Sequence, residues 1–492
     1  MIRARGTALA YPLGLLACFV VLATLNSGGY RYGASDQAFY QPAVLAKLDP
    51  ARFPRDSALI AAQARLTLMD ESIGALAQTT GLSLPHLFLA LYVTTLGLLA
   101  AGGWMIGRRM YRSVWTCLTL LAALTLRHAV ARSGTNTLEG YFHPRQLAFA
   151  FGALSVAAFL RGRGWPALLF VLLAGAVHPT TALWFAVWIG VATAVADRSL
   201  RVPIAVAAVC AGAAGAWAVT AGPLAGRLQP MDAAWLATLR TKEYLFPLGW
   251  PVYAWAFNLG TAALATWLYR LRTGAGLIDA RERGLFLGCL SLGVIFFIAV
   301  LLQTKVALAI QLQPARTFWM FDFLAIIYVV WALAEGRTPT PRRAIGALVM
   351  VLAFSVIRGV FVLVDLERQP FRVDVSDDDW GRVMRWARTT PKDSGWLADP
   401  MHAVTYGVSV RVAGERDVFV EAVKDAAIGM YDRAVAMRTA ERLDALPDFA
   451  GLTGEQAQAL ASRYDLDFIV TPATMALPVA FETGALRVYR LR

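Results

Sequence analysis

The chain has 492 residues, of which 58% are hydrophobic and 16% are charged, and its formal net charge is +13. Apolar runs of about 20 residues recur along the first three quarters, which excludes an ordinary soluble globular domain. The basic residues lie mainly in short loops between these runs, so membrane topology and anionic lipid explain them better than nucleic acid does. The composition predicts an α-helical polytopic membrane protein.

Eleven apolar segments are predicted to cross the membrane, since a helix needs about 20 residues to span a bilayer. The first follows the basic leader MIRARG and lacks a clear small-x-small cleavage site, so we interpret it as a spanning helix rather than a signal peptide. The predicted spans are 7–24, 86–107, 114–131, 145–160, 166–177, 180–196, 203–222, 251–270, 285–303, 317–335 and 345–365.

Loop charges predict the orientation of these spans. If the N-terminus is cytoplasmic, the leader and the inner connections hold 16 Lys or Arg residues against three acids, as the positive-inside rule requires. An odd number of crossings then places the C-terminal segment outside. We therefore expect a transmembrane domain over 1–366 and an extracytoplasmic domain over 367–492.

The first outer loop, 27–85, carries Asp36 and is not a flexible tether. Three stretches have apolar residues at roughly helical spacing, which favours amphipathic helices lying on the bilayer surface. These stretches are Gln37–Lys47, Ser57–Leu68 and Asp70–Gln78, separated by breaks at Pro50 and Pro54. Such helices would fix the position of Asp36, which either takes part in the chemistry or caps the helix that follows it.

Ionisable residues gather in the next outer loop and at a break in an apolar run. Glu139, His143 and Arg145 lie in and around the segment YFHPRQ. Arg145 either has a function or extends its side chain to the membrane interface. His143 is either a ligand or an ordinary loop residue. His178 and Pro179 interrupt the run AGAVHPTTALWF, so we expect a break within the membrane or in a recessed cavity. There His178 either binds a substrate or phosphate or stabilises the turn.

Two later outer loops supply the remaining candidates. Tyr244, in RTKEYLFP, either meets a ligand or belongs to a solvated face. Lys305 and Arg316 stand at the two ends of the loop between the ninth and tenth spans. A guanidinium at the level of the lipid headgroups can bind a phosphate bidentately, which makes Arg316 a candidate phosphate ligand.

The last 125 or so residues predict a small α/β domain, of a size that can fold alone. Residues 377–391 form an amphipathic pattern ended by Pro391, and LTGEQAQALASRYD predicts a helix opened by Thr453. Short buried strands are expected at SGWLADP, ERDVFVE, DFIVTP and GALRVYRLR. No phosphate-binding or metal-ligand motif occurs in this part.

This arrangement resembles the GT-C membrane glycosyltransferases. The shared features are a first helix that leads to a large outer loop with an early acid, about ten further spans, and an outer α/β domain. More closely, several motifs look like those of an uncharacterised bacterial family of GT-C-like membrane proteins, which implies a bacterial inner membrane. The motifs are SDQAFYQP, DPARFPRD, YFHPRQLAFAFG, AVHPTTALWF, QPAR, WARTTPKDSGWLADP, RYDLDFIVT and RVYRL.

The resemblance implies transfer of a hexosyl or pentosyl group from a polyprenyl-phosphate-linked sugar to an extracytoplasmic glycan, lipid or protein, with inversion. It assigns Asp36 as general base. The groups that it implies for the lipid phosphate are His143, Arg145, His178, Lys305 and Arg316. Secondary candidates are Gln37, Tyr40, Asp56, Glu139 and Tyr244.

Other classes of function remain open at this point. SDQ stands where many relatives show paired acids, so a requirement for Mg²⁺ or Mn²⁺ is undecided and no metal ligand is assigned. The chain is alternatively a lipid-linked glycan polymerase, ligase or transporter, although it shows no inverted helix repeats of the kind that favour transport. It is alternatively a non-catalytic GT-C-fold binding protein.

Overall fold

A computed structural model describes residues 2–65, 67–303 and 305–492. The chain divides into two compact units. The first, here called the helical unit, comprises Met1–Tyr30, Ala90–Pro230 and Glu243–Phe371. The second, called the mixed unit, comprises Arg31–Leu89, Met231–Lys242 and Arg372–Arg492. The two units are described separately.

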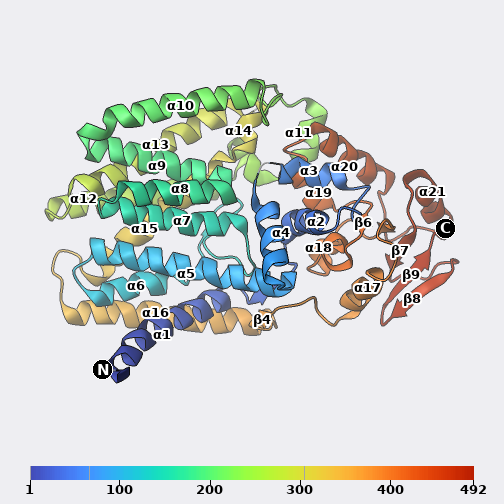
Figure 1. Ribbon diagram of the computed structural model, residues 1–492, viewed down its shortest axis with the longest axis horizontal. Helices are drawn as coiled ribbons and strands as arrows, with labels where there is room; N and C mark the ends of the chain where they lie inside the picture. The colour runs from blue at the N-terminus through green and yellow to red at the C-terminus, as the bar shows by residue number, and fades with distance from the viewer. Residues whose placement is uncertain (1, 66, 304) are drawn as a thin grey trace. The chain divides into compact units, whose positions relative to one another are not determined.

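A long helix lies over each predicted span (Figure 1). These helices are α1 (Ile2–Asn26), α5 (Leu84–Met110), α6 (Val114–Leu124), α7 (Pro144–Leu160), α8 (Gly164–Val177), α9 (Pro179–Ala196), α10 (Arg201–Thr220), α12 (Val252–Gly274), α13 (Ala280–Leu302), α15 (Thr317–Ala334) and α16 (Pro341–Asp365). The shorter elements are α14 (Ala307–Gln311), the 3-10 turns Arg198–Leu200, Glu243–Leu245, Pro247–Gly249 and Pro314–Arg316, and the strands β1 (Tyr30–Arg31), β2 (Ala129–Val130), β3 (Thr135–Asn136) and β4 (Phe371–Arg372).

Six helical stretches in the described chain have the length and composition of membrane-spanning segments. They are Leu84–Met110, Pro179–Ala196, Arg198–Thr220, Ala280–Leu302, Ala307–Ala334 and Pro341–Asp365. A helical membrane protein is therefore supported, and eleven crossings, with their orientation, stay a prediction.

One predicted span is wrong at its C-terminal end. The segment 114–131 was expected to be one helix, but α6 ends at Leu124 and the chain turns into β2, which pairs with β3. Thr125 explains the stop, because its hydroxyl donates to the Ala122 carbonyl at 2.6 Å and lies 2.6 Å from Ser355 Oγ. A hydroxyl that bonds the preceding turn competes with the helical pattern.

Close backbone contact joins α9 and α13, which lie side by side (Figure 1). A Cβ added at Gly284 or Gly288 would lie 2.4 Å from the carbonyl oxygens of Ala192 and Trp188, respectively. The Trp188 indole also donates to the Leu285 carbonyl at 2.8 Å. The glycines thus permit a helix crossing that any side chain would block.

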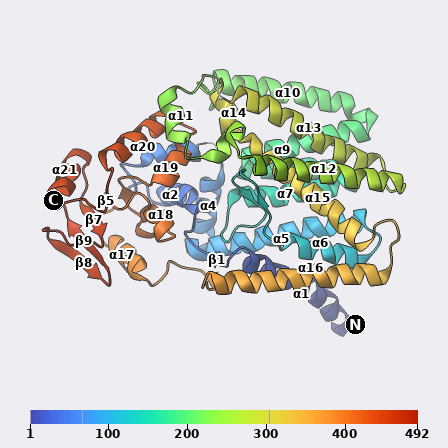
Figure 2. The same cartoon turned by 180° about the vertical axis from the view of Figure 1, so that it is seen from behind.

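The mixed unit contains a five-stranded sheet in the order β6-β5-β7-β9-β8. The strands are β5 (Gly395–Leu397), β6 (Asp417–Val418), β7 (Phe468–Thr471), β8 (Val479–Thr483) and β9 (Leu486–Arg490), and Figure 2 shows β7, β9 and β8 next to one another. β5 runs parallel to β6 and β7, whereas β9 is antiparallel to β7 and β8. The expected strands are present, and β8 was missed.

The described part of the mixed unit also contains nine α-helices, of which the first outer loop forms three. They are α2 (Gln37–Leu48), α3 (Ser57–Ala64), α4 (Met69–Thr80), α11 (Ala233–Leu239), α17 (Asp379–Ala387), α18 (His402–Thr405), α19 (Ala422–Ile428), α20 (Arg433–Ala445) and α21 (Gly454–Tyr464), with a π-helix over Val410–Gly414. The predicted helices of the loop are confirmed as α2, α3 and α4. Thr453 opens α21 through a capping box with Gln456, as the sequence predicted.

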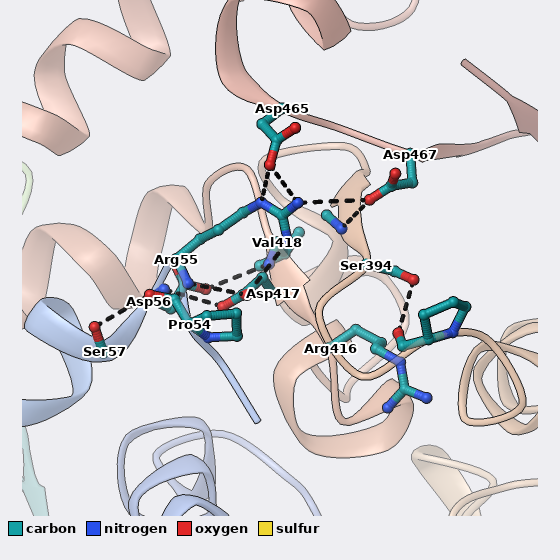
Figure 3. A network of polar contacts seen from close by, with 12 residues as sticks. Pro54, Arg55, Asp56, Ser57, Ser394, Arg416, Asp417, Val418, Asp465 and Asp467 are labelled. Carbon is teal, nitrogen blue, oxygen red and sulfur yellow. Dashed lines mark hydrogen bonds and ion pairs between the residues drawn. The ribbon is translucent and has the colours of Figure 1, made fainter. Parts of the chain in front are cut away.

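A polar network ties the first outer loop to the sheet within the mixed unit (Figure 3). The backbone N–H groups of Arg55 and Asp56 donate to the Asp417 carboxylate at 3.1 and 3.0 Å. The Arg55 guanidinium points the other way, toward Asp465 and Asp467. Burial and the neighbouring Asp56 carboxylate raise the pKa of Asp417 to about 6.

Candidate functional site

His143 begins helix α7 in the helical unit. Its side chain is 1% exposed, and its Nδ1 accepts the backbone N–H of Arg145 at 3.0 Å, while Pro144 occupies the first helical position. Proline is preorganised for that position and has no N–H to satisfy. Because a backbone N–H can only donate, the cap requires a lone pair on Nδ1 and leaves the proton of the neutral ring on Nε2.

Arg145 follows this cap and is held by the preceding loop. Its Nη2 donates to Glu139 Oε1 at 2.9 Å and its Nη1 to the Gly134 carbonyl at 3.1 Å. The side chains of Arg145 and Glu139 are 5% and 7% exposed, so the pair is buried. Burial of two opposite charges together requires such partners. Arg145 therefore does not snorkel to an interface as an isolated cation.

His178 repeats the arrangement at the start of α9. Its Nδ1 accepts the backbone N–H of Thr181 at 3.2 Å, with Pro179 at the first helical position. The turn-stabilising role weighed from the sequence is thus present. Thr181 Oγ1 also lies 3.1 Å from Nδ1, and Arg316 Nη1 lies 3.4 Å from Nε2. A guanidinium can only donate, so this contact directs Arg316 at the imidazole ring.

Three helix starts gather around these residues. Arg316 ends the 3-10 turn that leads into α15, and the charges of Arg316, His143 and Arg145 all act on His178. One turn deeper, Phe149 of α7 stacks on Trp319 of α15, with ring centroids 4.0 Å apart. The N-termini of α7, α9 and α15 are the positive ends of their dipoles and favour an anion.

The other candidates of the helical unit differ in position. Lys305 is exposed in the loop after α13, and its ammonium forms no ion pair with any residue that the structure describes. Tyr244 packs against Gly134, where an added Cβ would lie 3.1 Å from the tyrosine ring. Since the Gly134 carbonyl accepts from Arg145, Tyr244 supports the loop that holds the arginine.

Asp36 lies in the mixed unit, at the N-cap position of α2. Its side chain makes no capping hydrogen bond, so the interpretation of Asp36 as a helix cap is wrong. Instead its carboxylate accepts from Lys424 Nζ at 2.8 Å, and that ammonium also lies 5.0 Å from the Phe39 ring centroid. The two side chains are 26% and 10% exposed. Asp36 therefore faces a cation that the sequence did not single out.

A second lysine accompanies this pair. Lys242 Nζ donates to the Val423 carbonyl, next to Lys424. Burial and the positive charge of Lys424 lower the pKa of Lys242 to about 8. The sequence left Lys242 as either a ligand contact or part of a solvated face, like its neighbour Tyr244, whereas Lys424 was missed because only folding brings it near Asp36.

The secondary candidates of the mixed unit have structural partners. Asp56 is fully buried and accepts from Arg411 Nε at 2.6 Å and from Arg438. The Gln37 side chain is buried and accepts the backbone N–H of Gly33 at 2.6 Å. Tyr40 is partly exposed in the first turn of α2.

The role of a divalent cation stays a prediction. Within residues 2–65, 67–303 and 305–492, no group of three or more His, Cys, Asp or Glu side chains is placed to hold a metal ion. Mg²⁺ and Mn²⁺ prefer carboxylate and other oxygen ligands, whereas the cluster at His178 presents N–H donors.

The apolar helices place the chain among helical membrane proteins. No protein-family model matches it, and no curated protein matches it. Among solved structures, the crystal structure of the Archaeoglobus fulgidus oligosaccharyltransferase in the apo form is similar, with 11% identity and a TM-score of 0.47. The similarity covers 94% of this chain and 69% of that chain. At this level of likeness the function depends on the chain's own residues.

Proposed function

We propose that the chain is a membrane glycosyltransferase that moves a sugar from a polyprenyl-phosphate donor to an extracytoplasmic acceptor. The observation that carries the proposal is the contact of the Arg316 guanidinium with His178 at 3.4 Å, where α9 and α15 begin. A guanidinium at the positive ends of helices suits a phosphate in charge and geometry.

The chemistry assigned to this cluster is stabilisation of the leaving group. When the anomeric carbon–oxygen bond breaks, the electron pair stays on the lipid phosphate, whose negative charge increases. The Arg316 guanidinium and the positive helix ends would stabilise that charge at little cost in reorganisation, because the folded protein already holds them in place. Arg145 adds positive potential nearby.

Asp36 is our candidate for the general base. An acceptor hydroxyl would give its proton to the carboxylate as its oxygen attacks the anomeric carbon, and the configuration there would invert. In the resting protein Lys424 offsets the charge of this carboxylate. The base role therefore requires the acceptor hydroxyl to replace or extend the contact with Lys424.

Transfer from a labelled polyprenyl-phosphate sugar by the purified full-length chain tests the proposal. We expect Arg316→Gln to lower kcat about 100-fold, the usual effect of removing one donor to a developing oxyanion. Arg342→Gln is the matched control, since it makes the same substitution at an exposed arginine of the helical unit outside the candidate set. Asp36→Asn should abolish turnover and leave donor binding intact. Unchanged turnover in Arg316→Gln and Asp36→Asn would overturn both assignments.

The Lys424 contact also favours one alternative, a non-catalytic protein that binds lipid phosphate. In that case the donor lipid binds through Arg316, and neither the native chain nor Asp36→Asn turns it over. Binding measured alongside turnover separates the two functions, because only the transferase releases free polyprenyl phosphate.

A further inference from the structure

A second site lies in the helical unit, on α12 and α15, and the proposed transfer does not use it. It is a cavity of about 370 Å³ lined by residues of β2, α12 and α15. This volume is within the range of small-ligand sites. The lining residues that carry the argument are Tyr253, Phe257, Asn258, Phe318 and Asp322.

Asp322 is the unusual member of this wall. It lies on an apolar helical stretch of membrane-spanning length, where an ionisable side chain is costly and commonly marks a functional site. Its Oδ2 is buried and has no hydrogen-bond partner within the described part of the chain. Its Oδ1 lies 3.9 Å from His128 Nδ1, which is too far for a hydrogen bond.

The tautomer of His128 creates a position beside Asp322 that suits a hydrogen-bond donor. His128 Nε2 lies 3.3 Å from the Ala123 carbonyl, which can only accept, so the ring proton is on Nε2. In its neutral form the ring directs the Nδ1 lone pair toward the Asp322 carboxylate. Two acceptors face each other across a gap that a shared hydrogen-bond donor would fill.

Two donors of the cavity wall are already used by the protein. The Asn258 amide donates to the Ala131 carbonyl at 2.9 Å, and the Thr261 hydroxyl donates to the Phe257 carbonyl at 2.9 Å. A carboxylate among the aromatic rings of Tyr253, Phe257 and Phe318 suits a cation with N–H groups, through charge and cation–π attraction. The cavity therefore has the chemistry of an ammonium site.

At the edge of the cavity, Arg132 supplies a positive group that can bind an anion. Arg132 follows the lining residue Ala131, and its Nε donates to the Tyr253 hydroxyl at 2.8 Å. Tyr253 and Phe257 are also 48% and 68% exposed, on the first turns of α12. Asp322 is the sixth residue of α15, about 8 Å from its start. Tyr253, Phe257 and Asp322 lie within the first two turns of α12 and α15, and tyrosine is favoured at the ends of spanning helices.

We propose that this cavity binds the headgroup of a membrane phospholipid with a primary amine. The ammonium donates to Asp322 and His128, the phosphate lies at the rim with Arg132, and the acyl chains run along the exposed face of α12. Phosphatidylethanolamine is the simplest lipid with this combination. The site is independent of the phosphate cluster at His178.

Native mass spectrometry of the full-length chain tests this site. The chain would be exchanged into detergent with equal amounts of phosphatidylethanolamine, phosphatidylcholine and phosphatidylglycerol. We expect the wild type to retain phosphatidylethanolamine about tenfold over the other two, since only its headgroup both carries a positive charge and donates N–H bonds. This comparison changes the ligand alone, so it does not depend on the folding of a variant. Equal retention of all three lipids would overturn the proposal.

Two variants locate the effect. Asp322→Asn should abolish the preference, whereas Asp365→Asn should keep it, because Asp365 is an exposed carboxylate at the end of another apolar helix, α16. A preference that survives in Asp322→Asn refutes the assignment. Soluble glycerophosphoethanolamine is a phosphodiester with the same charges and no acyl chains, so its displacement of the lipid at equal concentration would refute a lipid site.

Discussion

Replacement of Asp56 by Asn is expected to destabilise the mixed unit and thereby separates a structural role from a catalytic one. Asp56 is completely buried and contacts Arg411, which is 1% exposed, as well as Arg438. It also accepts the backbone N–H of Val418 at 3.3 Å, on strand β6. Asn fills the same volume, so the substitution removes charge without opening a cavity.

The size of the stability loss depends on the partners that Arg411 retains in the variant. Removing one partner of a buried ion pair costs about 3–5 kcal/mol, and Asp425 still accepts from Arg411 at 2.6 Å, so we expect the lower value, about 3 kcal/mol. For a unit of roughly 150–250 residues each kcal/mol lowers Tm by about 2–4 °C. The expected fall in Tm is therefore about 6–12 °C.

Thermal unfolding of the full-length chain in detergent, followed by tryptophan fluorescence, measures this change. Glu482→Gln is the control, because its pair with Arg487 at 2.8 Å is at the surface and should contribute under about 1 kcal/mol. Specific activity per folded molecule should stay at the wild-type value. A loss of activity in Asp56→Asn without a fall in Tm would refute the structural assignment.

The same variant has a defined pH dependence. Burial opposes the charge of Asp56, but Arg411 and Arg438 outweigh it and lower the pKa of Asp56 to about 2. The group therefore contributes stability above about pH 4 that is lost as pH falls toward 2. The Tm difference between wild type and Asp56→Asn should close over this window, and a constant difference would contradict the reasoning.

Three further predictions concern pH, packing and capping. The pKa of Asp417 is raised, so the native state binds the Asp417 proton more tightly than the unfolded state does. The stability that this group contributes therefore falls as pH rises from about 4 to 6. In Asp417→Asn, the plot of Tm against pH should lose this decrease. Gly288→Ala should lower Tm, since its Cβ would lie 2.4 Å from the Trp188 carbonyl, whereas Gly293→Ala, with its nearest contact at 3.6 Å, should not. His178→Asn should keep Tm, because Asn caps a helix well, but lose lipid-phosphate binding, whereas His178→Ala should lose both binding and about 1 kcal/mol of stability.

Apolar length predicted the helices well, and local polar chemistry decided where the prediction failed. The helix over 114–131 ends early because the Thr125 hydroxyl bonds the preceding turn, an effect that hydropathy does not register. In the mixed unit, α20 was missed because Arg433–Ala445 is largely polar, and β8 because it has no clear alternation of buried residues. Helix α21 was found since its capping box is written in the sequence.

The sequence identified many of the residues in the candidate sites, but it did not show which of them contact one another. Asp36 and Lys424 are 388 positions apart, and Asp56 and Arg411 are 355 apart, so no local pattern links them. Sequence reasoning treated a histidine at a helix start as either a cap or a ligand. The structure shows why these roles are compatible, because the cap at His178 uses Nδ1 and Nε2 faces Arg316.

Helix α15 carries two sites of opposite polarity, and a histidine lies beside each. Arg316 precedes the helix and Asp322 lies six residues later, about 9 Å along the axis and about 240° around it, so the two residues face different neighbours. At His178 the ring contacts the Arg316 guanidinium through Nε2, and the positive charge of Arg316 selects an anion. At His128 a backbone carbonyl takes Nε2 and leaves a lone pair beside Asp322, which selects a donor. Since a neutral imidazole has one N–H and one lone pair, the backbone carbonyl at His128 decides which kind of ligand the other nitrogen of that ring can bind.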